Sequence, residues 1–282
     1  KEVLVRSPSQ FQTLYNNIKP SLTVDAVSAA FREASGNGVT AIHIRTKTPI
    51  ADLQNTVSAA LADSTKVAVS APVAETAKAF AYDSFGKAGK VTTDTTIADL
   101  GIRTVRFANG VKLNIRKTAY EAGKIQFGLR VGSGRAGLPS DQPGLAQLLE
   151  YMSPIDGLQA HDYDELQKIL TGKTVQLGLN AEDDAFVSSG LTSSADLEMQ
   201  LKLMAATISA FGYRAETDAQ WPDVAKLIAE GQKANATALF PLSSQNILSD
   251  GDARFGLIDP ALLAQRKMTE LKAAIDQQLK TG

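Results

Sequence analysis

Three polar residues, Gln147, Glu150 and Tyr151, have the spacing of a hydrolytic metal site on a predicted helix. In the inverted zinc motif His-x-x-Glu-His, two histidines one helical turn apart hold the metal, and the glutamate between them activates the bound water. Here Glu150 occupies the glutamate position, but an amide and a phenol replace the two imidazoles. The motif is therefore degenerate, and the sequence predicts neither a catalytic residue nor a metal ligand at these positions.

The helix that carries this motif is predicted over residues 144–152. Its apolar side chains recur at i, i+3, i+4 and i+7 and line one face, namely those of Leu145, Leu148, Leu149 and Met152. A predicted strand over residues 124–131 and a glycine-rich segment over residues 131–137 precede the helix. The degenerate motif therefore lies on the remaining, polar face.

A strand that ends in Gly132-Ser133, a polar loop, Pro143-Gly144 and then Leu-Ala-x-x-Leu-Glu-x-Met resembles the first core segment of the insulinase/pitrilysin-type zinc metallopeptidases. Members of that family have paired homologous halves, of which one holds the metal and the other has lost it. The resemblance implies that this chain contains a half of the second kind. That half is non-catalytic and has no cofactor of its own, and zinc is expected in a catalytic half that is missing here.

The same resemblance implies a role for the metal-free half, which closes a chamber where extended peptides are bound and cut. The implied partners are the catalytic half of the same polypeptide and peptide substrates, and a periplasmic or secreted bacterial location is implied, although the sequence leaves the compartment unknown. One alternative is a structural or peptide-binding homologue with no active half. An active hydrolase that uses other residues ranks last, because no Ser/His/Asp or Cys/His arrangement is present.

Composition excludes several classes of protein. The chain has 282 residues, of which 44% are hydrophobic, and a formal net charge of −1, so it offers no basic surface for nucleic acid or for an anionic membrane. It contains no cysteine and no apolar run of membrane-spanning length. Because the first methionine is Met152, we expect the chain to be a piece of a longer polypeptide.

The sequence predicts three regions. In residues 1–64, a helix that starts at Thr23, a strand over 39–45 and a helix that Pro49 opens make a partial α/β unit. This unit resembles the closing part of a preceding peptidase-like domain. Residues 65–100 have poor periodicity and are predicted to be an extended linker. Residues 101–282 are predicted to form the inactive peptidase-like domain.

That domain is predicted to belong to the α+β class, with an antiparallel or mixed sheet and helices packed on one face. Asn109-Gly110 predicts a type I′ hairpin between strands at 102–107 and 111–117, and the strand at 124–131 continues an antiparallel meander. The other predicted elements are helices at 163–170, from Ser193-Ser194 to Gly212, from Pro222, at 260–265 and at 268–279, and strands at 175–179 and 185–191.

Four further features have a functional reading and a structural one. Residues 132–137 satisfy G-x-G-x-x-G, but the helix after them begins too late for a dinucleotide site, so a polar loop is preferred. The two histidines, His43 and His161, are predicted to face solvent or to cap a helix. Residues 182–184, Glu-Asp-Asp, are predicted to be a solvated turn, because they lack the spacing of a calcium loop. Glu230 is the one glutamate in the helix from Pro222, but no motif assigns it the role of third zinc ligand.

Overall fold

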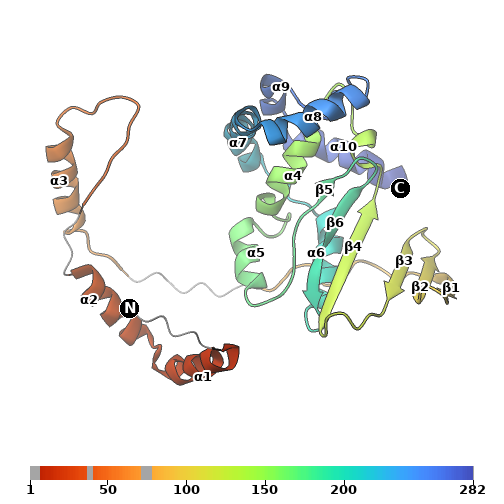
Figure 1. Cartoon of the computed structure of the whole chain (residues 1–282), viewed down its shortest axis with the longest axis horizontal. Helices are drawn as coiled ribbons and strands as arrows, with labels where there is room; N and C mark the ends of the chain where they lie inside the picture. Colours follow the sequence, from red (N-terminus) through yellow and green to blue (C-terminus); the bar gives the residue numbers. More distant parts are fainter. Residues whose placement is uncertain (1–6, 37–40, 71–77, 282) are drawn as a thin grey trace. The chain divides into compact units, whose positions relative to one another are not determined.

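The computed structural model describes residues 7–36, 41–70 and 78–281, and the chain divides into two compact units, residues 1–73 and 74–282 (Figure 1). The division falls inside the segment 65–100 that was predicted to be a linker. The three-region organisation itself stays a prediction.

Unit 1 consists of short helices, which are α1 (Pro8–Ile18), the 3-10 helix η1 (Lys19–Ser21), α2 (Val24–Gly36) and α3 (Leu53–Ser64). The predicted start of α2 is confirmed, because the Thr23 hydroxyl accepts a hydrogen bond from the Ala26 amide at 3.2 Å. The predicted strand at 39–45 is wrong over residues 41–45, which form neither helix nor strand, while residues 39 and 40 lie outside the described part.

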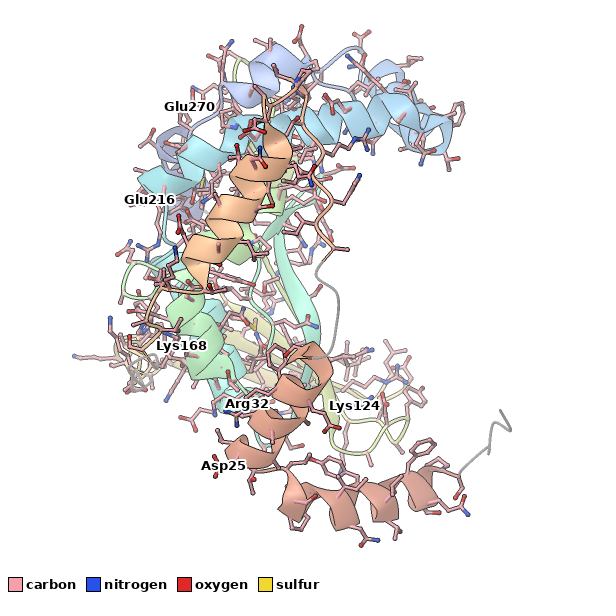
Figure 2. All side chains as sticks on the ribbon, turned by 90° about the vertical axis from the view of Figure 1, so that its left-hand side faces the viewer. Asp25, Arg32, Lys124, Lys168, Glu216 and Glu270 are labelled. Atoms are coloured by element: carbon pink, nitrogen blue, oxygen red, sulfur yellow. The ribbon has the colours of Figure 1, made fainter. Side chains whose placement is uncertain are left out.

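No described side chain of unit 1 is buried. Leu53, Val57 and Leu61 of α3 line a groove of about 560 Å³ together with Ile42 and Ile44, so their apolar side chains lie together but remain open to solvent. The charged residues of α2 are exposed, including Asp25 and Arg32, which Figure 2 labels. Unit 1 therefore has amphipathic elements and no closed core.

In unit 2, a first antiparallel sheet has the order β1-β2-β3, with β1 at Val91–Ile97, β2 at Ile102–Phe107 and β3 at Lys112–Arg116. The predicted hairpin is confirmed, but its turn is not type I′. Gly110 has φ +90° and donates to the Phe107 carbonyl at 3.0 Å, whereas Asn109 has no positive φ. A type I turn followed by a left-handed glycine has this pattern. Strand β1 lies in the segment that was predicted to be a linker.

The second antiparallel sheet has the order β4-β6-β5, with β4 at Lys124–Val131, β5 at Asn180–Ala181 and β6 at Phe186–Ser193. Strand β4 pairs with β6 rather than with β3, so the predicted meander is wrong at this step. The predicted strand at 175–179 is also absent. The Gln200 side chain binds the backbone of this segment instead, because the Gln176 amide donates to Gln200 Oε1 at 2.7 Å and Gln200 Nε2 donates to the Gln176 carbonyl at 3.0 Å.

The helices of unit 2 are the 3-10 helix η2 (Gly134–Gly137), α4 (Leu145–Asp156), α5 (Tyr163–Leu170), α6 (Leu197–Ser209), α7 (Ala215–Ala234), α8 (Ala236–Leu248), α9 (Pro260–Ala264) and α10 (Met268–Thr281). Three differ from prediction. Helix α6 has Asp196 rather than a serine at its N-cap and ends before Gly212, α7 contains Pro222 in its interior, and α8 was not predicted. The α+β class with antiparallel sheets is confirmed.

The main core of unit 2 surrounds α4, which contacts β5, α7 and α10 (Figure 1). Its largest fully buried members come from four elements, which are α4 (Leu145, Leu148, Leu149 and Met152), β6 (Phe186), α7 (Trp221) and α10 (Met268 and Leu271). Trp221 also donates its indole N–H to the Leu263 carbonyl at 2.7 Å. The predicted apolar face of α4 thus becomes the centre of the unit.

Candidate functional site

The degenerate motif is positioned by the glycine that precedes α4. Gly144 has φ +100°, and a Cβ atom there would lie 2.9 Å from Leu263 Cδ1 and 3.2 Å from Arg266 Cγ. Its carbonyl accepts the first hydrogen bond of the helix, from the Leu148 amide at 2.9 Å. A side chain at position 144 would therefore have to push the Leu263 side chain aside, and the positive φ of this residue also favours glycine.

The three motif residues differ in their exposure. Gln147 is only 8% exposed, and its Oε1 is buried without a hydrogen-bond partner among the described residues. Tyr151 is 47% exposed, and the Glu150 side chain is 48% exposed. The buried Gln147 amide, with its unsatisfied oxygen, thus stands at the first histidine position of the motif. Glu150 and Tyr151, at the glutamate and second histidine positions, are open to solvent.

Glu150 has a cation rather than an imidazole as its neighbour. Its Oε2 lies 3.9 Å from Arg135 Nη2, and Arg135 is held in place because its Nε donates to the Ala181 carbonyl at 2.9 Å. A half-exposed pair at this distance contributes little stability.

The donor atoms at this site do not fit zinc. Zinc sites in proteins use imidazole, thiolate and carboxylate ligands, whereas positions 147 and 151 offer an amide and a phenol. In the part of the chain that the structure describes, no three His, Cys, Asp or Glu side chains gather as a metal site would require. The chemistry that this arrangement supports is hydrogen bonding and packing.

The glycine-rich loop serves the packing of α10. Gln278 donates through Nε2 to the Gly134 carbonyl at 3.1 Å and accepts from the Ser133 amide at 2.7 Å, and a Cβ atom at Gly137 would lie 2.7 Å from its side chain. The preceding strand is antiparallel and α4 begins only at Leu145, so the geometry of a dinucleotide site is not present. Sequence reasoning missed Gln278, because nothing local links it to the loop.

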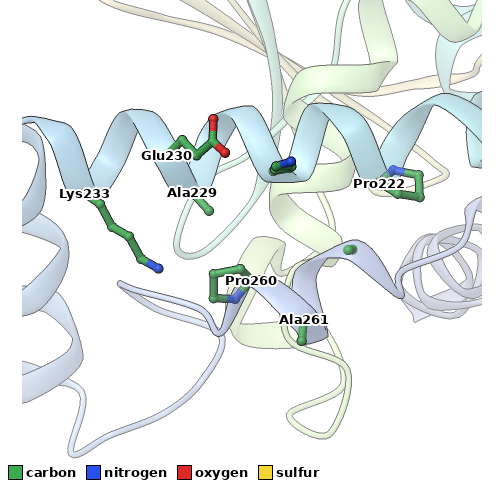
Figure 3. A pocket seen from close by; sticks show the side chains of 8 residues that line it. Pro222, Ala229, Glu230, Lys233, Pro260 and Ala261 are labelled. Carbon is green, nitrogen blue, oxygen red and sulfur yellow. The ribbon is translucent and has the colours of Figure 1, made fainter. Parts of the chain in front are cut away.

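Glu230 lies on α7, at a shallow groove of about 420 Å³ between α7 and α9. Figure 3 shows its carboxylate turned away from α9, while Lys233 extends toward Pro260. Among the described residues, Glu230 belongs to no group of side chains that could hold a metal ion. The acidic turn at 182–184 is exposed, and Arg130 pairs with Glu182 at 2.8 Å and with Asp184 at 2.6 Å.

The prediction for His161 is wrong, whereas His43 is exposed as predicted. His161 is only 2% exposed, and its Nε2 accepts a hydrogen bond from the Ala81 amide at 2.9 Å. The polar run around it indicated a helix start, and α5 does begin at Tyr163, with Asp162 as its cap. The partner that buries the histidine comes from a distant segment, for which the local sequence carries no signal.

No known family profile and no curated protein matches the sequence, but solved structures do. The ferredoxin protease FusC, in complex with Arabidopsis ferredoxin, is similar with a TM-score of 0.58 and 16% identity, over 86% of this chain and 26% of FusC. The periplasmic protease PqqL from Escherichia coli is similar with a TM-score of 0.57 and 14% identity, over 97% of this chain and 30% of PqqL. The peptidase M16 inactive domain from Pseudomonas fluorescens is similar with a TM-score of 0.52 and 23% identity, over 62% of this chain and 43% of that domain.

These likenesses show the fold, which is that of M16 peptidases. One of the similar structures is an inactive M16 domain. The predicted resemblance to the insulinase/pitrilysin type is confirmed at the level of the fold. The chain spans less than half the length of each of these structures.

Within the described ranges, none of the helices combines the length and the apolar character needed to cross a bilayer.

Proposed function

We propose that residues 101–282 are the non-catalytic, peptidase-like domain of a zinc metallopeptidase, and that this domain closes a peptide-binding chamber opposite a catalytic half outside this chain. The observation that carries the proposal is the replacement of both imidazole positions on α4 by Gln147 and Tyr151, in a fold that resembles an M16 inactive domain. The partners are then the catalytic half and peptide substrates, and the zinc belongs to that half.

Residues 1–64 fit the same proposal as the closing part of a preceding domain, joined through residues 65–100. Its support is the groove formed by Ile42, Ile44 and α3, whose apolar side chains have no described layer over them. The likeness to PqqL, which extends over 97% of this chain, supports a continuous arrangement of peptidase-like domains. PqqL is a periplasmic protease, and we propose a periplasmic or secreted location for this protein as well.

Metal analysis after dialysis tests the absence of a zinc site in this chain. We expect well below one zinc per chain in the unmodified protein, because an amide and a phenol supply little zinc affinity. The Gln147→His/Tyr151→His variant places two imidazoles at i and i+4 and is expected to bind zinc weakly, since a third ligand and the groups that orient each imidazole are missing. About one tightly held zinc in the unmodified chain would overturn the proposal.

Peptide cleavage tests the second part. Neither the unmodified chain nor the double variant is expected to cleave unfolded or peptide substrates, because no metal-bound water and no oxyanion donors are assembled at α4. The matched control is Glu150→Ala in both backgrounds. Activity that survives purification controls and disappears with Glu150→Ala would show that this domain is an enzyme.

The full-length polypeptide separates this proposal from the alternative of a structural or peptide-binding homologue. With an intact His-x-x-Glu-His in its other half, it should cleave peptides and lose that activity when that glutamate is replaced. A full-length protein that binds peptides but has no such motif would favour the alternative.

A further inference from the structure

The residues that enter unit 2 after the boundary between the units are attached to α5 and α6. Phe80 is only 8% exposed and packs in a small second core with Leu158, Leu166, Leu203 and Ala206. The Tyr82 hydroxyl accepts a hydrogen bond from the Ala160 amide at 2.9 Å, and Lys202 pairs with Asp83 at 3.0 Å. Residues 78–83, here termed the anchor segment, are therefore bound through both apolar and polar contacts.

His161 is the centre of this attachment. Its ring stacks on Phe80 with a centroid distance of 5.7 Å and an interplanar angle of 16°, and it meets the Tyr82 ring edge-on at 6.0 Å. Its Nε2 accepts from the Ala81 amide at 2.9 Å. A nitrogen that accepts a hydrogen bond carries no proton, so the imidazole is neutral here and its proton is on Nδ1.

The charged groups around the ring come from α5 with its N-cap and from the anchor segment. Glu165 on α5 lies 3.4 Å from Nδ1, and Lys78 of the anchor segment pairs with the other oxygen of that carboxylate. The hydrogen bond from Lys78 holds the pKa of Glu165 below its usual range, so this carboxylate stays ionised at mildly acidic pH. Asp162 caps α5 by accepting from the Glu165 amide, and the α6 residues in the second core, Leu203 and Ala206, are apolar.

We propose that His161 is a proton-controlled attachment point, whose protonation releases the anchor segment from α5 and α6. A proton added to the ring goes to Nε2, the atom that accepts from Ala81. Two N–H donors then face each other at a buried position, and an unsatisfied buried donor costs more than the hydrogen bond is worth. Histidine is the side chain that ordinarily changes charge between about pH 5 and pH 8, so mild acid is the signal. Release detaches residues 78–83 from the rest of unit 2.

Hydrogen exchange of the Ala81 amide in the full chain tests the proposal, with NMR following the His161 ring in the same samples from about pH 8 to about pH 5. After correction for intrinsic exchange, protection of Ala81 should fall at least about five- to tenfold as the ring protonates, because release removes at least this one hydrogen bond. The two transitions should have the same midpoint. Constant protection of Ala81 through the ring titration would overturn the proposal, and this measurement needs no variant.

Two substitutions sharpen the test. His161→Gln keeps an oxygen that can accept from Ala81 and does not titrate, so its protection should not depend on pH, whereas His161→Phe keeps the ring contact and should be poorly protected at every pH. His43→Gln is the matched control and should behave as the unmodified chain. A pH-dependent loss that persists unchanged in His161→Gln would assign the effect to another group and refute the role of His161.

Discussion

Units 1 and 2 both have helices with an apolar face, but this face is buried in unit 2 and exposed in unit 1. In α4 the apolar face is closed, with Leu148 and Met152 at 0% exposure, whereas Phe31 on the apolar side of α2 is 72% exposed. Both helices are amphipathic in sequence. The periodicity of apolar residues therefore predicts which face of a helix can be buried. Whether that face becomes part of a core depends on a second layer of structure that packs against it.

The helices of unit 1 are held mainly by local contacts. At the start of α1, the Ser7 hydroxyl accepts from the Gln10 amide at 3.3 Å and the Ser7 amide donates to Gln10 Oε1 at 2.8 Å, a capping box. Caps of this kind contribute about 1 kcal/mol, and helices as short as these are marginal in water without packing. Unit 2 instead gains its stability from contacts between distant segments.

Hydrogen exchange should give the largest difference between the units. Amides such as that of Leu149 in α4 should exchange only through global unfolding, while that of Ala30 in α2 should exchange through local opening. We expect protection to differ by on the order of a thousandfold or more. Equal protection in the two helices would mean that unit 1 has a core of its own, and the comparison would fail.

Truncating a core leucine should follow in size. Leu148→Ala is expected to lower the free energy of unfolding by about 2–5 kcal/mol, because the lost side chain is fully buried and leaves a cavity. Leu201→Ala on α6 is the matched control, since Leu201 is 52% exposed, and its cost should stay within about 0.5–1 kcal/mol. Chemical denaturation measures both, and similar losses would contradict the assignment of the core around α4.

Replacing buried glutamines should distinguish the degenerate site from a working polar contact. Gln147→Leu should be neutral or stabilising, by up to about 1 kcal/mol, because the buried Oε1 has no described partner. Gln200→Leu should cost about 1–3 kcal/mol, because Gln200 accepts from the Gln176 amide and donates to the Gln176 carbonyl at 3.0 Å. A marked loss of stability in Gln147→Leu would show that this amide still has a structural role.

The smallest expected effect concerns Asp156 at the end of α4. Burial raises the pKa of its carboxyl, although the Thr217 hydroxyl and the Arg214 amide, which both donate to it, lower that pKa in part. A carboxyl with a raised pKa binds its proton more tightly in the folded state, so its ionised form costs stability above that pKa, and this cost disappears as the pH falls through it. Unfolding curves between neutral pH and about pH 4 should therefore show the unmodified chain gaining stability relative to Asp156→Asn. A constant difference would contradict the raised pKa.

The sequence by itself determined the elements with strong local patterns. The helix at 163–170, the strands at 102–107 and 124–131 and the apolar face of α4 were predicted correctly, because their periodicity and caps depend on neighbouring residues only. The loss of both imidazoles beside Glu150 was also visible in the sequence, since it is a matter of residue type and spacing.

Tertiary structure decided everything that depends on a distant partner. Alternation in β4 defined its two faces but not its neighbour, which is β6 rather than the next strand in sequence. Pro222 looked like a helix start, yet α7 continues through it while Trp221 and Ala225 on either side are buried. His161 lies in a polar run and is nevertheless buried, because Phe80 and Ala81 pack on it from a segment far away in the chain. Burial and pairing of this kind are set by long-range packing, which overrides the local preference of a residue.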